Sequence, residues 1–158
     1  MVSDSLTLKQ VDFQNYSVLM NLAQAYEAEF SSITLKDPDL EGKFTLDTSV
    51  DANNHEIILF SGKIPIGFAV IGKIDSRFDI GEFYILPKFR KLGAGKFFAH
   101  EIISRYPGPW QARQIAGADQ ATSFWRAVIH EFTAGQYLEE IVDDLYWGKV
   151  TKQIFESP

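Results

Sequence analysis

The most informative segment of the chain reads Arg90-Lys91-Leu92-Gly93-Ala94-Gly95, with Lys96 next. It follows a run with strand character, residues 79–86, and precedes an amphipathic pattern that predicts a helix from residue 94 to about 106. The first N–H groups of a helix have no partner within the helix, and the helix dipole places partial positive charge beside them. Because glycine lets a phosphate approach this backbone closely, the segment predicts an anion site suited to a pyrophosphate.

The loop is basic although the chain has a net charge of −6, and its four basic residues are Lys88, Arg90, Lys91 and Lys96. A P-loop requires Ser or Thr after its Gly-Lys pair to hold magnesium, but Phe97 follows here. A Rossmann fingerprint requires a third glycine where Phe98 stands. Both of these phosphate-binding motifs are therefore excluded.

The pattern that remains is Arg/Gln-x-x-Gly-x-Gly/Ala after a strand that ends in hydrophobic-x-Pro, and here it covers residues 85–95. It resembles the acyl-CoA-binding motif of the GNAT superfamily of N-acetyltransferases. A second segment, Phe124-Trp125-Arg126, stands where this superfamily commonly carries Phe-Tyr in its last helix. It is similar to a Phe-Trp-Arg run in a bacterial branch of predicted acetyltransferases.

Hydrophobic periodicity predicts strands over residues 6–11, 56–60, 64–74, 78–86, 110–116, 136–142 and 145–154. Helices are predicted over residues 15–30 and 94–106, and from Asp119 as N-cap to about residue 132. Residues 31–54 read as a loop with a short second helix or turn. We therefore expect an α/β (α+β) fold in one domain, residues 1–158, with a mixed, mostly antiparallel sheet flanked by helices on both faces. This is also the element order of the GNAT fold.

Composition limits the functional classes. The absence of cysteine from the 158 residues excludes disulfides, thiolate metal sites and a cysteine acyl-enzyme. A net charge of −6 argues against a nucleic-acid partner, because binding to phosphates needs a basic face. No apolar run approaches the about 20 residues that span a bilayer, and no secretion signal is recognisable, so we expect no membrane partner and a cytoplasmic location. The three histidines have no metal-ligand spacing, and no metal is expected.

The resemblance implies acetyl-CoA as co-substrate and a primary amine of a small molecule or peptide as acceptor, with direct transfer by a monomer or homodimer. It implies a pyrophosphate site on the N–H groups of Leu92, Gly93, Ala94, Gly95 and Lys96, to which Arg90 and Lys91 add charge. The pantetheine arm would lie beside Ile85 and Leu86, and one backbone amide there would polarise the thioester carbonyl. Trp125 completes the set of residues expected at the cofactor.

An alkyl amine is mostly protonated at neutral pH, so the reaction needs a base or a water relay. Our candidate is Glu82, because strand alternation puts Glu82, Tyr84 and Leu86 on one face. If that face lines the cleft, Glu82 and Tyr84 both view the acceptor. If it does not, Glu82 is a solvated carboxylate.

The general acid stays open at this point. The superfamily commonly has a tyrosine where Trp125 stands, and an indole N–H cannot serve as this acid. Tyr84, Tyr137 and Tyr146 are candidates, and CoA can also leave as the thiolate. A non-catalytic GNAT-like domain that binds CoA or a partner is the alternative function. An acidic group, residues 139–144, either recruits a cationic acceptor or is the solvated end of a hairpin.

Overall fold

The computed structural model describes residues 5–46 and 54–158. The chain divides into two compact units. The first contains the described residues up to Ile71 together with Gly81–Gly95, and the second contains Gly72–Ile80 and Lys96–Pro158. Strands β3 (Ile64–Ile74) and β4 (Arg77–Ile85) contribute residues to both units.

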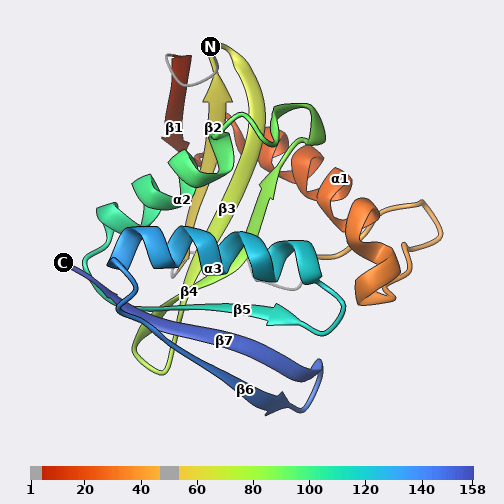
Figure 1. Cartoon of the computed structure of the whole chain (residues 1–158). Helices are drawn as coiled ribbons and strands as arrows, with labels where there is room; N and C mark the ends of the chain where they lie inside the picture. Colours follow the sequence, from red (N-terminus) through yellow and green to blue (C-terminus); the bar gives the residue numbers. More distant parts are fainter. Residues whose placement is uncertain (1–4, 47–53) are drawn as a thin grey trace. The chain divides into compact units, whose positions relative to one another are not determined.

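The first unit is built from antiparallel strands and one long helix (Figure 1). Strand β1 (Leu6–Gln10) pairs with β2 (His55–Ser61), and β2 pairs with β3 through a tight turn. Helix α1 (Tyr16–Thr34) packs its apolar stripe on these strands because its apolar residues recur at helical spacing. The buried cluster that joins them consists of Leu19, Leu22, Ala23, Ile58, Phe68, Val70 and Tyr84.

The second unit holds α2 (Ala94–Arg105), β5 (Gly108–Ile115), α3 (Asp119–Thr133), β6 (Leu138–Asp144) and β7 (Gly148–Ser157). Strand β7 lies between β5 and β6 and is antiparallel to both. Helix α3 packs on β5 and β7, as Figure 1 shows. The start of β4 pairs in parallel with β5 at Phe78 and Asp79, and buried Trp110 stacks on Phe155.

The strands follow the order β1-β2-β3-β4-β5-β7-β6 in a seven-stranded sheet. The pairing of β4 with β5 is parallel, and the other pairings with a recorded direction are antiparallel. The predicted mixed, mostly antiparallel sheet and its element order are therefore confirmed. No helix within the described part of the chain is long and apolar enough to cross a membrane.

Two predicted helix boundaries were wrong. Helix α1 runs on to Thr34 and ends where Leu35 takes a left-handed conformation, φ 60°, so the polar residues after Phe30 continue the helix. Within residues 35–46 the predicted loop contains a turn and no second helix, and the Gly42 N–H donates to the Asp39 carbonyl at 2.9 Å. The rest of the predicted loop, 47–53, lies outside the described residues. The N-cap of α3 is Ala118, and Asp119 is the first helical residue, where its negative charge still interacts favourably with the helix dipole.

The closing hairpin is also displaced from its predicted position. Asp144 accepts hydrogen bonds from the N–H groups of Tyr146 and Trp147, at 2.8 and 2.9 Å. This side-chain turn reverses the chain after Asp144, so β7 begins at Gly148. The spacing of hydrophobic residues alone cannot predict a turn that is formed by the hydrogen bonds of one carboxylate.

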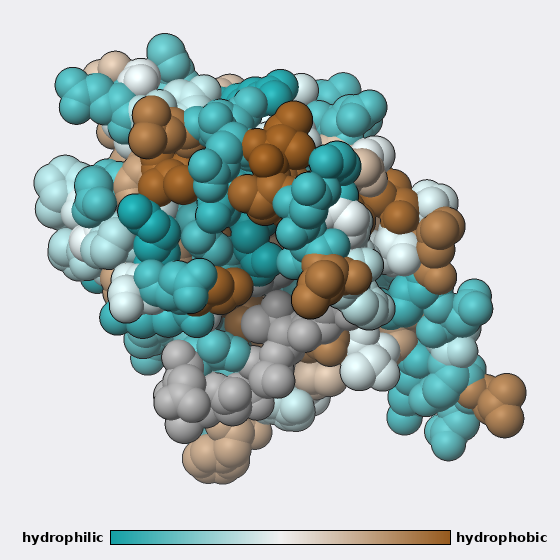
Figure 2. All heavy atoms as spheres, turned by 90° about the horizontal axis from the view of Figure 1, so that it is seen from below, coloured by the Kyte–Doolittle hydropathy of each residue, from teal (hydrophilic) through white to brown (hydrophobic). Residues whose placement is uncertain are grey.

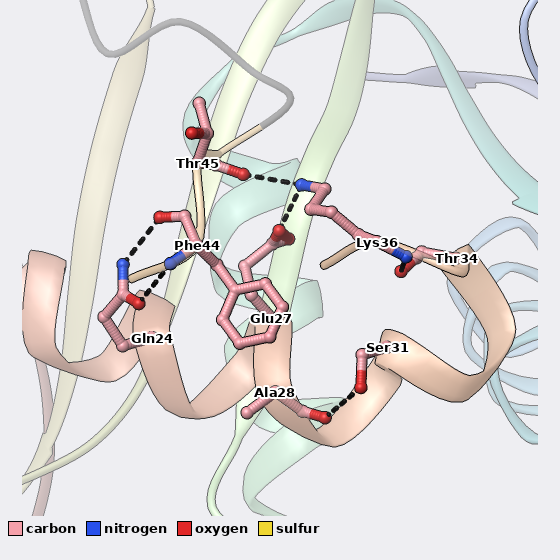
Figure 3. Close-up of polar contacts among 8 residues, drawn as sticks. All are labelled: Gln24, Glu27, Ala28, Ser31, Thr34, Lys36, Phe44 and Thr45. Atoms are coloured by element: carbon pink, nitrogen blue, oxygen red, sulfur yellow. Dashed lines mark hydrogen bonds and ion pairs between the residues drawn. The ribbon is translucent and has the colours of Figure 1, made fainter. Parts of the chain in front are cut away.

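The segment after α1 is held on the helix by side-chain contacts (Figure 3). Gln24 binds the backbone of Phe44 in both directions, each at 2.8 Å. The Lys36 ammonium contacts the Glu27 carboxylate and the Thr45 carbonyl, the latter at 2.6 Å. Glu27 is buried, with 4% of its side chain exposed, so this is an ion pair of the interior.

Some large apolar side chains are exposed to solvent. On the face in Figure 2, hydrophobic residues stand in small groups separated by hydrophilic ones. Large exposed apolar side chains include Phe13, Leu40, Leu138, Ile141, Leu145 and Tyr146. Four of these residues lie in β6 or in the turn that follows it, and exposed apolar residues as such are normal at a protein surface.

The Glu27–Lys36 pair makes a stability prediction. Lys36→Met removes the ammonium group that contacts the buried Glu27 carboxylate, so we expect a loss of about 3–5 kcal/mol in the free energy of unfolding, measured by urea denaturation. The control is Lys43→Met, because Lys43 faces Glu41 at 4.0 Å with both side chains mostly exposed. That change should stay within about 0.5 kcal/mol. Equal losses for the two variants would contradict a buried pair.

Candidate functional site

The predicted anion loop joins β4 to α2 through a sharply turned backbone. A short 3-10 helix, η2 (Pro87–Phe89), follows the strand, and α2 begins at Ala94. Between them Lys91 and Gly93 have positive φ, 65° and 85°. A Cβ built on Gly93 would meet nothing within 4 Å, so glycine is favoured here by backbone conformation and not by lack of space.

The loop is open to solvent at its tip. Lys91, Leu92 and Gly93 are exposed, whereas Ala94 is buried under the first turn of α2. Lys96 is also exposed and forms an ion pair with Glu131 at 3.2 Å. The first N–H groups of α2 thus belong to a helix end that solvent reaches, beside basic side chains.

The charge of Arg90 is directed at a carboxylate and not at the loop. Its Nη1 and Nη2 donate to the two carboxylate oxygens of Glu29 in α1, at 2.7 and 3.0 Å. Its Nε donates to the backbone carbonyl of Ile85 at 2.8 Å. A two-pronged guanidinium–carboxylate contact of this kind is among the strongest polar contacts in proteins.

Glu29 is the residue that the sequence did not reveal. It lies outside the apolar stripe of α1 and is separated from Arg90 by 61 positions. No local spacing rule connects charges that are so distant in sequence. Its acidic character in an otherwise amphipathic helix was the only signal, and acidic residues on a helix are common.

Tyr84 belongs to the same group of contacts. Its ring is 3% exposed and lies edge-on to Tyr26 and Phe30, with the Arg90 guanidinium 5.5 Å from the ring centre. Its hydroxyl donates to Glu29 at 3.1 Å. Burial, followed by the hydrogen bond to Glu29, raises the pKa of Tyr84 to about 12.

The raised pKa of Tyr84 predicts an alkaline transition. Because the folded pKa lies above the value near 10 in the unfolded chain, this stabilisation is present below about pH 10 and is lost as the pH rises towards about 12. Ultraviolet titration of the six tyrosines should find one phenol that ionises late, and Tyr84→Phe should remove it. Tyr146→Phe, at a 75% exposed position, is the control and should leave this late ionisation in place. Simultaneous ionisation of all six in folded protein would contradict the assignment.

The end of β4 is held closely against β3. The Leu86 N–H donates to the Ile66 carbonyl at 2.8 Å. A Cβ on Gly67 would lie 2.3 Å from the Tyr84 carbonyl oxygen, so only glycine permits this approach. Ile85 is 6% exposed. Of the two residues expected beside the pantetheine, Ile85 is thus the last residue of β4 and Leu86 directly follows the strand.

Glu82 is buried, with 3% of its surface exposed. The alternative in which it is a solvated strand carboxylate is therefore wrong. The alternation predicted for β4 also places Tyr84 and Leu86 together, because both pack against the α1 cluster. The structure thus brings Tyr84, Ile85, Leu86, Arg90 and Gly93 together in the first unit.

Trp125 lies in α3, in the second unit, and is 6% exposed with its indole edge-on to Phe124 at 5.1 Å. Of the other candidate acids, Tyr146 is 75% exposed at the β6–β7 turn. Tyr137 lies edge-on to His130 at 6.4 Å. His100 is partly buried, with Nε2 3.2 Å from the Val128 carbonyl.

The acidic group of β6 is neutralised by neighbours within its own unit. Ion pairs join Glu139 to Arg126 at 2.8 Å, Glu140 to Lys152 at 3.2 Å and Asp143 to Lys149 at 2.7 Å. The Arg126 contact lowers the pKa of Glu139. These contacts favour the hairpin-end interpretation over recruitment of a cationic acceptor. Across residues 5–46 and 54–158, no group of three or more side chains is placed to hold a metal ion.

No protein-family model and no curated protein matches the chain. Solved structures do match it. An acetyltransferase from Thermus thermophilus is similar with a TM-score of 0.69 at 16% identity, covering 96% of this chain and 97% of that chain. A GNAT-family acetyltransferase from Bacteroides thetaiotaomicron, described as putative, gives 0.63 at 15%, covering 96% and 88%.

The ribosomal-protein-S18-alanine N-acetyltransferase from Escherichia coli is similar with a TM-score of 0.63 at 10% identity, covering 97% of this chain and 95% of that chain. Identities at this level establish the fold and leave the substrate undetermined. The chain therefore has the fold of the GNAT acetyltransferases.

Proposed function

We propose that the protein is an acetyl-CoA-dependent N-acetyltransferase that moves an acetyl group directly to a primary amine of a small molecule or peptide. The observation that carries this proposal is the exposed, basic loop at the start of α2, directly after β4 of a GNAT fold. Structural neighbours include the spermidine N-acetyltransferase of Vibrio cholerae, which supports an amine acceptor. We take residues 1–158 as one acetyltransferase domain that acts in the cytoplasm, without a metal, as a monomer or homodimer.

We assign the binding of acetyl-CoA mainly to backbone N–H groups. The N–H groups of Leu92 to Lys96 receive the pyrophosphate, and the exposed Lys91 adds positive charge. Successive N–H groups of a strand point to opposite edges. Because the Leu86 N–H faces β3, the Ile85 N–H faces the other edge, and it is our candidate for polarising the thioester carbonyl.

The chemical step uses Glu82 as base. Glu82 accepts a proton from the acceptor ammonium, and the amine nitrogen then attacks the thioester carbonyl carbon. As the new C–N bond forms, the C–S bond breaks and CoA departs as thiolate, while the second proton on the acceptor nitrogen passes to solvent water and leaves a neutral amide. Tyr84 is a poor acid for that thiolate, because its pKa of about 12 lies well above the about 8.5 of an ordinary thiol.

Calorimetry with acetyl-CoA tests the donor site. We expect saturable binding with a dissociation constant between about 1 µM and 1 mM, the usual range for enzyme substrates. Lys91→Glu should weaken it about tenfold or more, whereas Lys63→Glu, at the exposed β2–β3 turn, should not. No binding to folded protein at millimolar acetyl-CoA would sink the proposal. Preferential binding of ATP or NAD would point to another phosphate ligand.

Glu82→Gln tests the base. The amide keeps the shape of the side chain but cannot accept the proton, so kcat should fall about 100-fold while acetyl-CoA affinity is little changed. Glu101→Gln, on the exposed surface of α2, is the matched control. A pH–rate profile identical to that of the wild type would remove Glu82 from the mechanism.

A second candidate is a GNAT-like domain that binds CoA without turnover. Two observations favour it: Trp125 stands where the superfamily commonly has tyrosine, and the Tyr84 hydroxyl is committed to Glu29. Thiol release from acetyl-CoA across a panel of polyamines, amino acids, amino sugars and peptides separates the two. Binding without release for any amine would favour this second function.

A further inference from the structure

We propose that Glu29 and Arg90 form a brace that positions the Ile85 backbone for catalysis, and that Arg90 is not a ligand of the donor's phosphates. This inference rests on the acetyltransferase function proposed above. It gives Glu29 a role as a positioning residue. It also reassigns the arginine that opens the glycine motif.

The charge of Arg90 is paired with a carboxylate. Its guanidinium contacts both oxygens of Glu29, so the carboxylate neutralises it at close range. The two side chains are 34% and 31% exposed, which partly shields the pair from solvent. A phosphate arriving at the loop would therefore meet an ion pair with no net charge in place of a cation.

Arg90 holds the backbone carbonyl of Ile85. Its Nε donates to the Ile85 carbonyl, on the edge of β4 that faces away from β3. On the other edge, the Leu86 N–H is bonded to Ile66, and Gly67 admits the Tyr84 carbonyl at very short range. The peptide units around Ile85 are thus fixed from both edges of the strand. Arg90 supplies one of these two constraints.

Glu29 is itself held by the Tyr84 hydroxyl. Its Oε1 accepts from the Tyr84 hydroxyl as well as from Arg90, and the Tyr84 ring lies beside the guanidinium. Tyr84 is itself buried in the α1 cluster. The brace therefore rests on a packed aromatic core and not on two mobile surface side chains.

The brace and a phosphate-ligand role predict opposite effects of Glu29→Gln. If Arg90 binds phosphate, this change frees its charge, so acetyl-CoA should bind more tightly and with a steeper dependence on salt. If the pair is a brace, the Ile85 amide is displaced from the reacting carbonyl. In that case kcat should fall about tenfold or more, because small displacements of catalytic groups are costly.

The experiment compares Glu29→Gln, Arg90→Lys and the double variant, using the amine that gives the fastest thiol release. Lysine keeps the charge but cannot make the two-pronged contact. We expect kcat to fall about tenfold in each single variant, KM for acetyl-CoA to stay within about threefold, and the double variant to be no worse than either single one. Glu140→Gln, which breaks the Lys152 pair on the β6–β7 hairpin, is the control that should leave kcat unchanged.

Other results would overturn the brace. A raised KM with unchanged kcat in Arg90→Lys, or tighter acetyl-CoA binding in Glu29→Gln, would make Arg90 a phosphate ligand. A lowered melting temperature with unchanged kcat and KM would make the pair merely structural.

A measurement without turnover separates this inference from the proposed function. The amide resonances of Ile85 and Leu86 should shift in Glu29→Gln and Arg90→Lys and stay in place in Glu140→Gln. Unmoved resonances would overturn the brace whether or not the protein is active. If the resonances shift in the two variants but the wild-type protein releases no thiol, the positioning of Ile85 is retained and the acetyltransferase function is rejected.

Discussion

The guanidinium of Arg90 ties three segments of the first unit together. It joins α1 through Glu29, the end of β4 through the Ile85 carbonyl, and its own loop at the entrance to α2. The loop follows directly after Arg90, with left-handed backbone conformations at Lys91 and Gly93. The proposed anion site would thus depend on a charged contact that offers no charge to the anion itself. What remains for a phosphate is the backbone of the helix end and the exposed lysines.

Helix α1 contacts two flanking segments through residues only two positions apart. Glu27 binds Lys36 and holds the segment up to Thr45 on the helix, as Figure 3 shows. Glu29 binds Arg90 of the donor loop. The apolar stripe of α1 explains why the helix packs on the sheet, but these carboxylates determine where the flanking segments lie. Changes in α1 would therefore affect both the segment after the helix and the proposed donor loop.

Elements with a strong period were predictable, and contacts between distant polar residues were not. The helix over Asp119–Thr133 and the strand over Ile64–Ile74 follow from apolar spacing, and the loop at Gly93 follows from glycine and charge. The Glu29–Arg90 pair spans 61 positions and has no local signature. The Asp144 turn depends on a single side chain replacing a backbone partner. Both are tertiary or side-chain choices that residue periodicity does not encode. Burial and bonding also decide the roles of the candidate catalytic residues. Glu82 and Tyr84 are both buried, and the Tyr84 hydroxyl is bonded to Glu29, which favours support of the ion pair over the role of acid that the sequence suggested.

The central claim is that the donor's pyrophosphate binds the backbone at the start of α2 while Arg90 stays on Glu29. An NMR titration of labelled protein with acetyl-CoA, following backbone amides and arginine Nε–H resonances together, tests it most directly. We expect the largest changes in chemical shift at the backbone amides of Gly93 to Lys96 and a further change at the Ile85 amide. The Arg90 Nε–H resonance should not move. Shifts absent from these amides, or dominated by the Arg90 side chain, would contradict it.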